Sequence, residues 1–213
     1  MSPKDEPLIW LQGEVKTPPL SGAARLEAGF LLRRIQRGDL LGMPQSRPMP
    51  RMGRRCHELR ILDAKSNWRV IYRIDADAMV ILEVFPQKTS VTPKGVIDTC
   101  RRRAKGMTMR ARKNSKLNSN GWKVGTAKDF LGLSDEEEAY IDLRLRFAEG
   151  LKARRRARGV TQVEMAKSIK SSQSRVAKME AGHPTVSLDL LLRSLLALGA
   201  TNRELAAIIS RRQ

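Results

Sequence analysis

The sequence predicts two domains, an α+β domain with a small antiparallel sheet followed by an all-α domain. The first half of the chain holds strand patterns, whereas the second half holds helical patterns. Between them, residues 106–121 have almost no large apolar side chain and no period, which is typical of a flexible linker. We therefore predict domains at 1–105 and 122–213, joined by a basic linker at 106–121.

The first half contains one long helical pattern and several strand patterns. A helix is expected over Ser21–Arg37, where apolar residues recur at helical spacing until Gly38. Gly42–Gly53 is rich in Pro and Gly and is expected to be a loop. Thr92 and Pro93 mark the start of a helix that runs to about Arg103. Strands are expected at Leu8–Gln12, Cys56–Leu62, Trp68–Asp75 and Met79–Phe85.

After the linker, only helices are expected. Ala127–Leu131 has the length of a single turn or little more. Capping boxes begin two longer helices, one at Ser134–Glu137 and one at Thr161–Glu164. Further helices are expected from Ser171 to Gly182, over Ser187–Leu198, and over Asn202–Ser210.

The charge of the chain points to a polyanionic partner. Forty-one Lys and Arg against 22 Asp and Glu give a formal net charge of +19. Nucleic acid is the leading partner, since the basic run 154–158 has too few apolar neighbours for a membrane-surface helix. The sequence has neither a signal-peptide pattern nor an apolar run of membrane-spanning length, so we expect a cytoplasmic protein without membrane contact.

Cysteine and histidine are too few to support a disulfide scaffold or a metal centre. The two cysteines, Cys56 and Cys100, lack the spacing of metal ligands. The two histidines, His57 and His183, leave little room for a His-rich site. We therefore expect reduced thiols, no metal and no cofactor.

Residues 161–182 have the pattern of a helix-turn-helix. Val163, Ile169, Val176 and Met179 are spaced to pack inward. The second helix would then present four polar side chains outward, namely Gln173, Ser174, Arg175 and Lys178. Gln and Arg bind base edges with two hydrogen bonds in the major groove, so these residues are candidates for DNA binding. Gln162 begins the first helix, where a side chain reaches a backbone phosphate.

This stretch resembles the XRE (Cro/repressor-like) family, which has a lambda-repressor-like fold. The resemblance covers about residues 143–200 and includes the helix expected over Ser187–Leu198. The pattern that carries it is Thr161-Gln162, Ala166, Ser172-Gln-Ser-Arg-Val176 and Met179-Glu-Ala-Gly182. It implies a DNA-binding domain that forms a homodimer and represses transcription at an operator. The alternative is a set of ordinary amphipathic helices with solvated polar faces.

The first half resembles the RelE/ParE toxin fold and, within it, phage-derived host-inhibition toxins of the HigB type. The resemblance covers about residues 5–103 and lies in short segments, namely Trp10-Leu11, Thr17–Pro19, Glu58–Arg60, Trp68–Arg73, Phe85–Thr89 and Thr92–Lys94. It implies an endonuclease that cleaves ribosome-bound mRNA through attack of a 2′-OH on the adjacent phosphate. At Gln87 the sequence departs from the family, which commonly has two consecutive basic residues there.

The resemblance also implies roles for individual residues. Arg69 and Lys88 would stabilise the phosphate in the transition state, as catalytic cations. Tyr72 would stack on a base or donate a proton, although its position in the strand also suits a core face. Three further basic residues are candidates for binding RNA phosphates, namely Arg60, Arg73 and Lys94. His57 is expected to be structural or solvated rather than catalytic.

A toxin upstream of a HigA-type helix-turn-helix antitoxin is the gene order of the host-inhibition family. The chain therefore reads as a toxin fused to its antitoxin, with operator DNA, ribosome-bound mRNA and the other domain, in cis or in trans, as partners. The alternative is a non-enzymatic regulator whose first domain has lost catalysis and serves as a binding or dimerising module. Retention of Arg69 and Lys88 favours the first hypothesis, and Gln87 favours the second.

Overall fold

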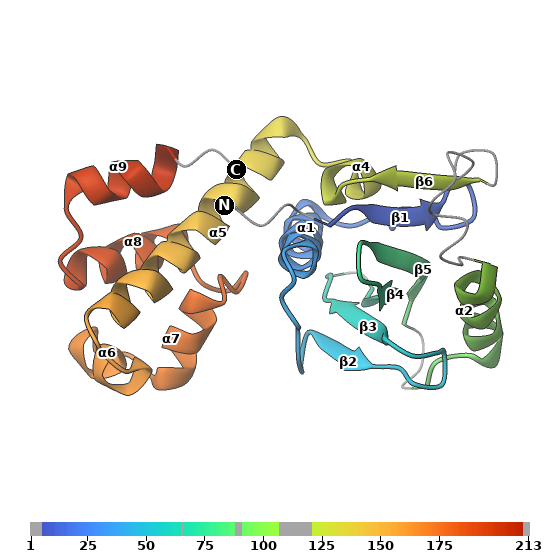
Figure 1. The fold of residues 1–213 in the computed structure, drawn as a ribbon, viewed down its shortest axis with the longest axis horizontal. Coiled ribbons are helices and arrows are strands. Elements are labelled where there is room, and N and C mark those ends of the chain that lie inside the picture. Colours follow the sequence, from blue (N-terminus) through green and yellow to red (C-terminus); the bar gives the residue numbers. More distant parts are fainter. Residues whose placement is uncertain (1–5, 65, 88–90, 107–120, 211–213) are drawn as a thin grey trace. The chain divides into compact units, whose positions relative to one another are not determined.

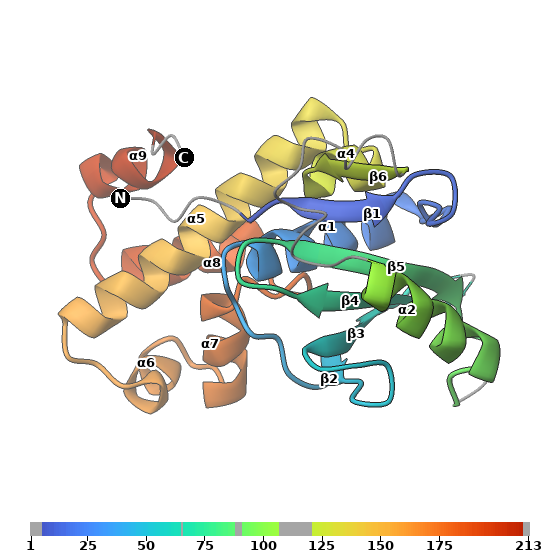
Figure 2. The same cartoon turned by 45° about the vertical axis from the view of Figure 1, so that its right-hand side comes forward.

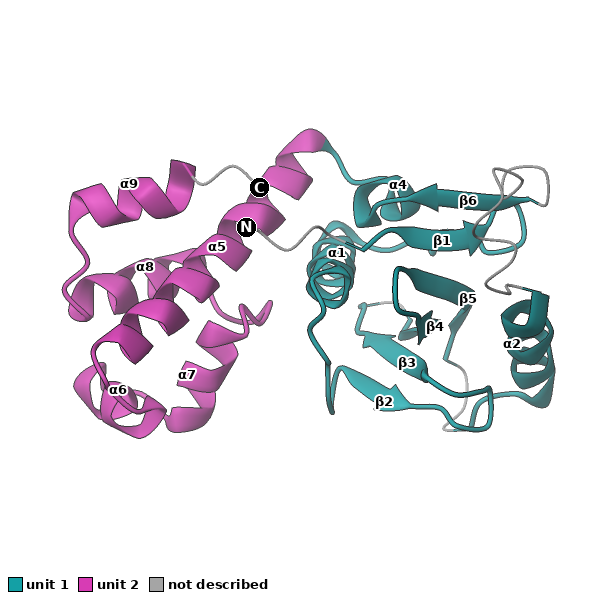
Figure 3. Ribbon diagram, in the orientation of Figure 1, with its two compact units in different colours: residues 1–134 teal, residues 135–213 magenta. Residues whose placement is uncertain are grey.

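The structure is a computed structural model that describes residues 6–64, 66–87, 91–106 and 121–210 (Figure 1). The chain divides into two compact units, residues 1–134 and residues 135–213 (Figure 3). Unit 1 is an α+β unit and unit 2 is all helix, which confirms the predicted fold class. None of the described helices is both long and apolar enough to cross a membrane.

Unit 1 is built on a six-stranded sheet with the order β2-β3-β4-β5-β1-β6. Neighbouring strands from β2 to β5 are antiparallel, β1 runs parallel to β5, and β6 pairs with β1 in the antiparallel sense. The strands are β1 (Leu8–Leu11), β2 (Ser46–Pro48), β3 (Cys56–Ile61), β4 (Trp68–Ile74), β5 (Met79–Pro86) and β6 (Trp122–Gly125). Strand β2 lies inside the segment predicted to be a loop, because pairing with β3 orders a stretch that has no strand pattern of its own.

Two helices cover different faces of this sheet, α1 (Gly22–Gln36) and α2 (Lys94–Gly106) (Figures 1 and 2). On the α2 face, Val80 and Leu82 of β5 pack with Cys100 in one hydrophobic cluster. Met79 and Ile81 alternate with them and point to the other face, where α1 buries its apolar stripe. The sheet is therefore buried on both faces along β5, as the continuous apolar run of this strand predicted.

Residues 121–134 correct the predicted domain boundary. We expected only helices after the linker, but Trp122–Gly125 forms β6 at the edge of the sheet, and α4 (Ala127–Leu131) packs against α1. Unit 1 therefore ends at Ser134 and not before the linker. The sequence did not predict β6, because its four residues include Lys and Gly and show no strand period. Pairing with β1 stabilises the strand instead. Residues 107–120 of the predicted linker lie outside the described residues.

Unit 2 consists of the helices α5 (Asp135–Ala157), α6 (Gln162–Ser168), α7 (Gln173–Glu180), α8 (Leu188–Ala197) and α9 (Asn202–Ser210). Ser172 and Ser187 cap α7 and α8, and Thr161 forms the predicted capping box with Glu164. Lys170 has φ 50° at the turn between α6 and α7, a left-handed conformation that ends α6 and redirects the chain.

The core of unit 2 corrects one inward position. Val163 is 52% exposed, whereas Met165 and Ala166 are the buried residues of α6. Val176 and Met179 pack inward as predicted, and Ile169 packs at the margin of the same cluster. A helix that starts at Gln162 turns Val163 toward solvent, so the inward stripe begins two residues later than the sequence pattern indicated.

Candidate nucleic-acid interfaces

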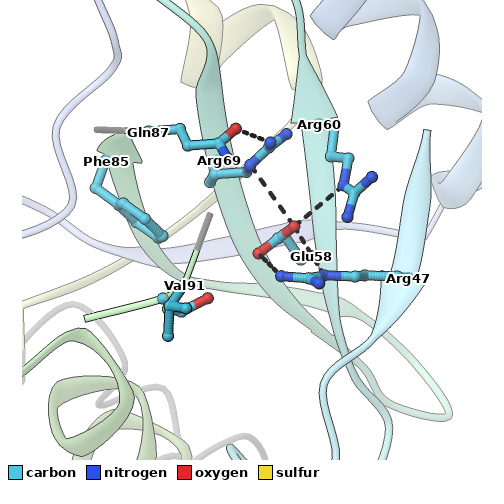
Figure 4. A pocket seen from close by; sticks show the side chains of 8 residues that line it. Arg47, Glu58, Arg60, Arg69, Phe85, Gln87 and Val91 are labelled. Carbon is cyan, nitrogen blue, oxygen red and sulfur yellow. Dashed lines mark hydrogen bonds and ion pairs between the residues drawn. The ribbon is translucent and has the colours of Figure 1, made fainter. Parts of the chain in front are cut away.

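A pocket rich in arginine lies on the sheet of unit 1. It is lined by residues from β2, β3, β4 and β5 and by the segment that follows β5, namely Arg47, Glu58, Arg60, Arg69, Phe85, Gln87, Val91 and Thr92 (Figure 4). Strand register brings these residues together, because Arg47 is paired with Glu58 and Arg69 is paired with both Arg60 and Phe85. Directly paired residues project from the same face of a sheet.

Glu58 is the centre of this pocket. Its side chain is only 2% exposed, and its carboxylate accepts hydrogen bonds from Arg47 at 3.0 Å and from Arg60 at 3.2 Å. The Nε atom of Arg69 lies 3.6 Å from the same carboxylate. A buried carboxylate is stable only when it is paired and hydrogen-bonded, so these contacts fix both Glu58 and the arginines around it. Three guanidinium groups against one carboxylate leave an excess of two positive charges.

Arg69 has a donor that its protein neighbours do not use. Its Nη2 atom donates to Oε1 of Gln87, and its Nε atom faces Glu58 (Figure 4). Its Nη1 atom is buried and has no hydrogen-bond partner among the described residues. Burial lowers the pKa of Arg69 and the charge of Glu58 opposes this effect. Since the three arginines carry more charge than Glu58 neutralises, an anionic oxygen is the ligand that this pocket fits best.

The structure brings only some of the predicted residues together. Arg60 and Arg69 both line the pocket. Arg73 lies elsewhere, where it donates to Asp75 and to the carbonyl oxygen of Ala104. Lys94 is an exposed residue at the start of α2 and does not line the pocket. Lys88 lies outside the described residues.

Tyr72 is a core residue, so its predicted place in the catalytic site is wrong. The side chain is 1% exposed, and its hydroxyl group is 2.8 Å from Oγ of Ser46 in a buried hydrogen bond. Its ring stacks on His57, with 5.4 Å between the ring centroids. Tyr72 is three positions after Arg69 on β4, so strand alternation turns it away from the side that carries Arg69. The alternative reading of Tyr72 as part of a core face is the one that fits.

Sequence reasoning missed two charged members of the pocket, Arg47 and Glu58. Glu58 and Arg60 are two residues apart on a strand, and this spacing alone places both on one face. The sequence alone could therefore have placed Glu58 beside Arg60. Arg47 was not predictable, because it belongs to the segment that we expected to be a loop and its place depends on pairing with β3.

Within the described part of the chain, no group of three or more His, Cys, Asp and Glu side chains lies together as a set of metal ligands. The two cysteines are free and buried in the cluster on the α2 face. Burial raises the pKa of Cys100 to about 12, so this thiol is protonated at neutral pH.

In unit 2, α7 presents the predicted polar surface. Gln173, Ser174, Arg175 and Lys178 are all exposed. Gln173 is also held in place, since its Nε2 atom donates to Oε1 of Gln162 at 2.8 Å. Gln162 in turn donates to Glu180 at 2.9 Å. Gln162 therefore orients a side chain of α7, in addition to its predicted place near a phosphate.

Glu180 organises this arrangement. Arg155 of α5 donates to both carboxylate oxygens of Glu180. Burial alone would raise the pKa of Glu180. The hydrogen bonds from Arg155 and Gln162 lower it by more, so the pKa lies below its ordinary value. The carboxylate of Glu180 thus links α5, α6 and α7. Through Gln162 it also fixes the side chain of Gln173 on the exposed side of α7.

Comparisons with known families agree with the division of the chain into an α+β unit and a helical unit. Residues 19–105 match the family model of the phage-derived Gp49-like proteins, and residues 146–208 match that of a helix-turn-helix domain. The chain combines a Gp49-like domain with a helix-turn-helix domain. This order of domains is consistent with a toxin–antitoxin fusion that contains a DNA-binding part. Neither a curated protein nor a solved structure matches the chain.

We predict that Glu58→Gln destabilises unit 1 by about 3 kcal/mol, because it leaves the buried Arg69 and the half-buried Arg47 and Arg60 without a counter-charge. Urea unfolding of the full chain, followed by tryptophan fluorescence, measures the effect, since all three tryptophans belong to unit 1. Inorganic phosphate should restore part of the loss by supplying the missing negative charge.

Asp75→Asn is the matched control for this substitution, because Asp75 pairs with Arg73 away from the pocket. Phosphate should not restore the stability of that variant. Equal responses of the two variants to phosphate would contradict the assignment of an anion site around Glu58.

We predict a pH-dependent contribution from Glu180. Its pKa is lowered in the folded state, so its contribution is present above the ordinary glutamate pKa of about 4.3 and is lost as the pH falls through the folded value. Glu180→Gln should lower protection of the α6 and α7 amides from hydrogen exchange at pH 7. The difference from the original chain should shrink at pH 3, and a difference that stays constant would contradict the prediction.

Proposed function

We propose that the chain is a toxin–antitoxin fusion in which the Gp49-like domain is an endoribonuclease that cleaves ribosome-bound mRNA. The helix-turn-helix domain neutralises this activity and represses its own operator as a homodimer. The observation that carries the enzymatic part is the pocket in which Arg47, Arg60 and Arg69 surround the single buried carboxylate of Glu58. A HigB-type toxin and a HigA-type antitoxin are the family members that the sequence resembles.

In this proposal the pocket binds the scissile phosphate of RNA. The 2′-oxygen attacks the adjacent phosphorus and loses its proton to solvent, and the bond to the 5′-oxygen breaks as that oxygen takes up a proton. The products are a 2′,3′-cyclic phosphate and a 5′-hydroxyl end. Arg69 stabilises the extra negative charge on the pentacoordinate phosphorus, and Arg47 and Arg60 bind neighbouring phosphate oxygens.

Other pocket residues have supporting roles. Glu58 positions the arginines and is not a proton acceptor, because its carboxylate is occupied by their donors. Phe85 lines the pocket and offers a ring on which a base can stack. Lys88 follows Gln87 in the sequence and stays a proposed second cation.

In the helix-turn-helix domain, α7 is the proposed recognition helix. Its exposed Arg175 and the oriented Gln173 would read base edges in the major groove. Two copies of the domain would bind half-sites about one helical turn apart.

A second candidate function is a non-enzymatic regulator whose Gp49-like domain only binds other molecules. Gln87 favours this candidate. Its side chain accepts a hydrogen bond from Arg69, at a position where the toxins that the sequence resembles commonly have a basic residue. A pocket that binds an anion but lacks sufficient positive charge would hold RNA without cleaving it.

We predict that Arg69→Ala slows cleavage of ribosome-bound mRNA by about 10²–10³-fold, the scale for loss of one transition-state donor. The assay uses the full chain with a protease site inserted between Ser134 and Asp135, where the two units meet in the sequence. Cleavage in a cell-free translation system, mapped by primer extension, should be slow before the cut and fast after it. EDTA, at a concentration that keeps the ribosomes intact, should not change the rate of cleavage.

Arg102→Ala is the control for this experiment, since Arg102 is an exposed arginine of α2 that does not line the pocket. It should cleave like the original chain. Equal cleavage by the Arg69→Ala and Arg102→Ala chains would show that the site is wrong. No cleavage before or after the cut would favour the non-enzymatic regulator.

We predict that Arg175→Ala weakens binding to the operator by about 1–3 kcal/mol and relaxes base preference. Operator sequences can be selected from a random duplex library with the full chain, and affinities measured at one salt concentration. Arg193→Ala is the matched control, because Arg193 is an exposed arginine on α8. A loss for Arg175→Ala that is equal on operator and random DNA would show that Arg175 binds only phosphate.

A further inference from the structure

Residues 121–134 belong to neither family match, because the Gp49-like match ends at 105 and the helix-turn-helix match begins at 146. They are nevertheless part of unit 1. We propose that residues 121–134 form a docking element by which the DNA-binding half of the chain holds the Gp49-like domain. This docking element would stay bound even when the chain is broken between residues 106 and 121. The inference rests on the proposed division into two halves and not on nuclease activity.

The first contact of the docking element is a strand added to a free sheet edge. All four residues of β6 pair with β1, from Leu8 opposite Gly125 to Leu11 opposite Trp122. The amide of Gln12 extends the ladder to the carbonyl oxygen of Gly121 at 2.7 Å. On its other side β1 pairs with β5, so β6 satisfies the edge that β1 would otherwise expose. Strand addition of this kind is a common way to bind a peptide segment.

The second contact is the packing of α4 beside α1. Phe130 is 1% exposed, and its ring meets that of Trp10 edge to face, with 5.3 Å between the centroids. The carbonyl oxygen of Phe130 accepts a hydrogen bond from the hydroxyl group of Thr17. At the start of α4, the amide of Ala127 donates to Oε1 of Gln36 at 3.3 Å. These bonds join α4 to side chains that precede it by about ninety residues or more in the chain.

The docking element also reaches the other face of the sheet. Trp122 packs into the hydrophobic cluster on the α2 face, together with Ile9 and Val80. Lys123 lies over the ring of Trp10, with its Nζ atom 5.4 Å from the centroid. The element thus fixes β1 from both sides.

The turn between β6 and α4 is shaped to fit this surface. A Cβ atom on Gly125 would lie 2.8 Å from the carboxylate of Asp129 and 3.0 Å from the ring of Trp10, so only glycine fits there without a shift. Asp129 closes a capping box with Thr126, which starts α4 directly after the strand. This local geometry lets a short segment make both the strand contact and the helix contact.

The docking element leaves the arginine pocket open. The pocket is lined by residues of β2 to β5 and of the segment after β5, whereas β6 pairs only with β1 at the opposite edge of the sheet. Holding the Gp49-like domain is therefore a separate task from covering its pocket. The docking element keeps the DNA-binding half at the Gp49-like domain, and any silencing of the pocket must come from other residues.

The test breaks the full chain without removing either half. A protease site is inserted within residues 107–120 and the chain is cut to completion. We expect the two pieces to elute together in gel filtration at micromolar concentration. Phe130→Ala should weaken the association by about 10²–10³-fold, as expected for truncation of a buried aromatic side chain.

Phe147→Ala is the matched control, because Phe147 is buried in the core of unit 2 and makes no part of the docking element. It should leave the pieces together. Thr17→Val is a milder variant that removes only the hydrogen bond to Phe130, and it should weaken association by about 5–10-fold even if Phe130→Ala fails to fold.

Separation of the cut pieces at micromolar concentration, with both still folded by circular dichroism, would overturn the proposal. Equal association of the Phe130→Ala and Phe147→Ala chains would also overturn it. The readout contains neither RNA nor DNA, so a failure of docking and a failure of the proposed nuclease are distinguishable.

Discussion

The interaction on which the proposed site depends is the buried carboxylate of Glu58. Without it, Arg47, Arg60 and Arg69 would be three like charges on adjacent strands, which repel one another. The carboxylate offsets that repulsion and fixes each guanidinium group in one orientation. Because a single negative charge cannot neutralise three positive ones, the same cluster that is stable in the folded protein still attracts an anion.

Unit 2 uses the same physical device for a different surface. Glu180 is a buried carboxylate that binds Arg155 and Gln162, and Gln162 in turn orients Gln173 on the exposed side of α7. In both units a desolvated acid fixes side chains of a proposed nucleic-acid surface. Such preorganisation reduces the conformational entropy that a nucleic-acid partner would otherwise cost on binding.

Local pattern was enough to predict the helices, the strands β1, β3, β4 and β5, and the exposed polar face of α7. It failed where a distant partner decides the structure. Strand β6 exists because β1 offers an edge, and β2 exists because β3 pairs with it. Tyr72 was assigned to the site by resemblance, but strand alternation and a hydrogen bond to Ser46 place it in the core. Glu58 was visible in the sequence, yet its importance depends on arginines from three strands.

The most direct test of the account is guanidinium ¹⁵N NMR of the full chain during titration with an RNA oligonucleotide that carries one 2′-deoxy nucleotide and so resists cleavage there. The account predicts a saturable shift of the Arg69 guanidinium signal, because a phosphate bound in the pocket adds a negative charge beside that group. The signal of Arg73, whose donors are bound to Asp75 and Ala104, should stay unchanged. Equal responses of the two arginines, or no response of Arg69, would contradict the assignment of this pocket as the RNA-phosphate site.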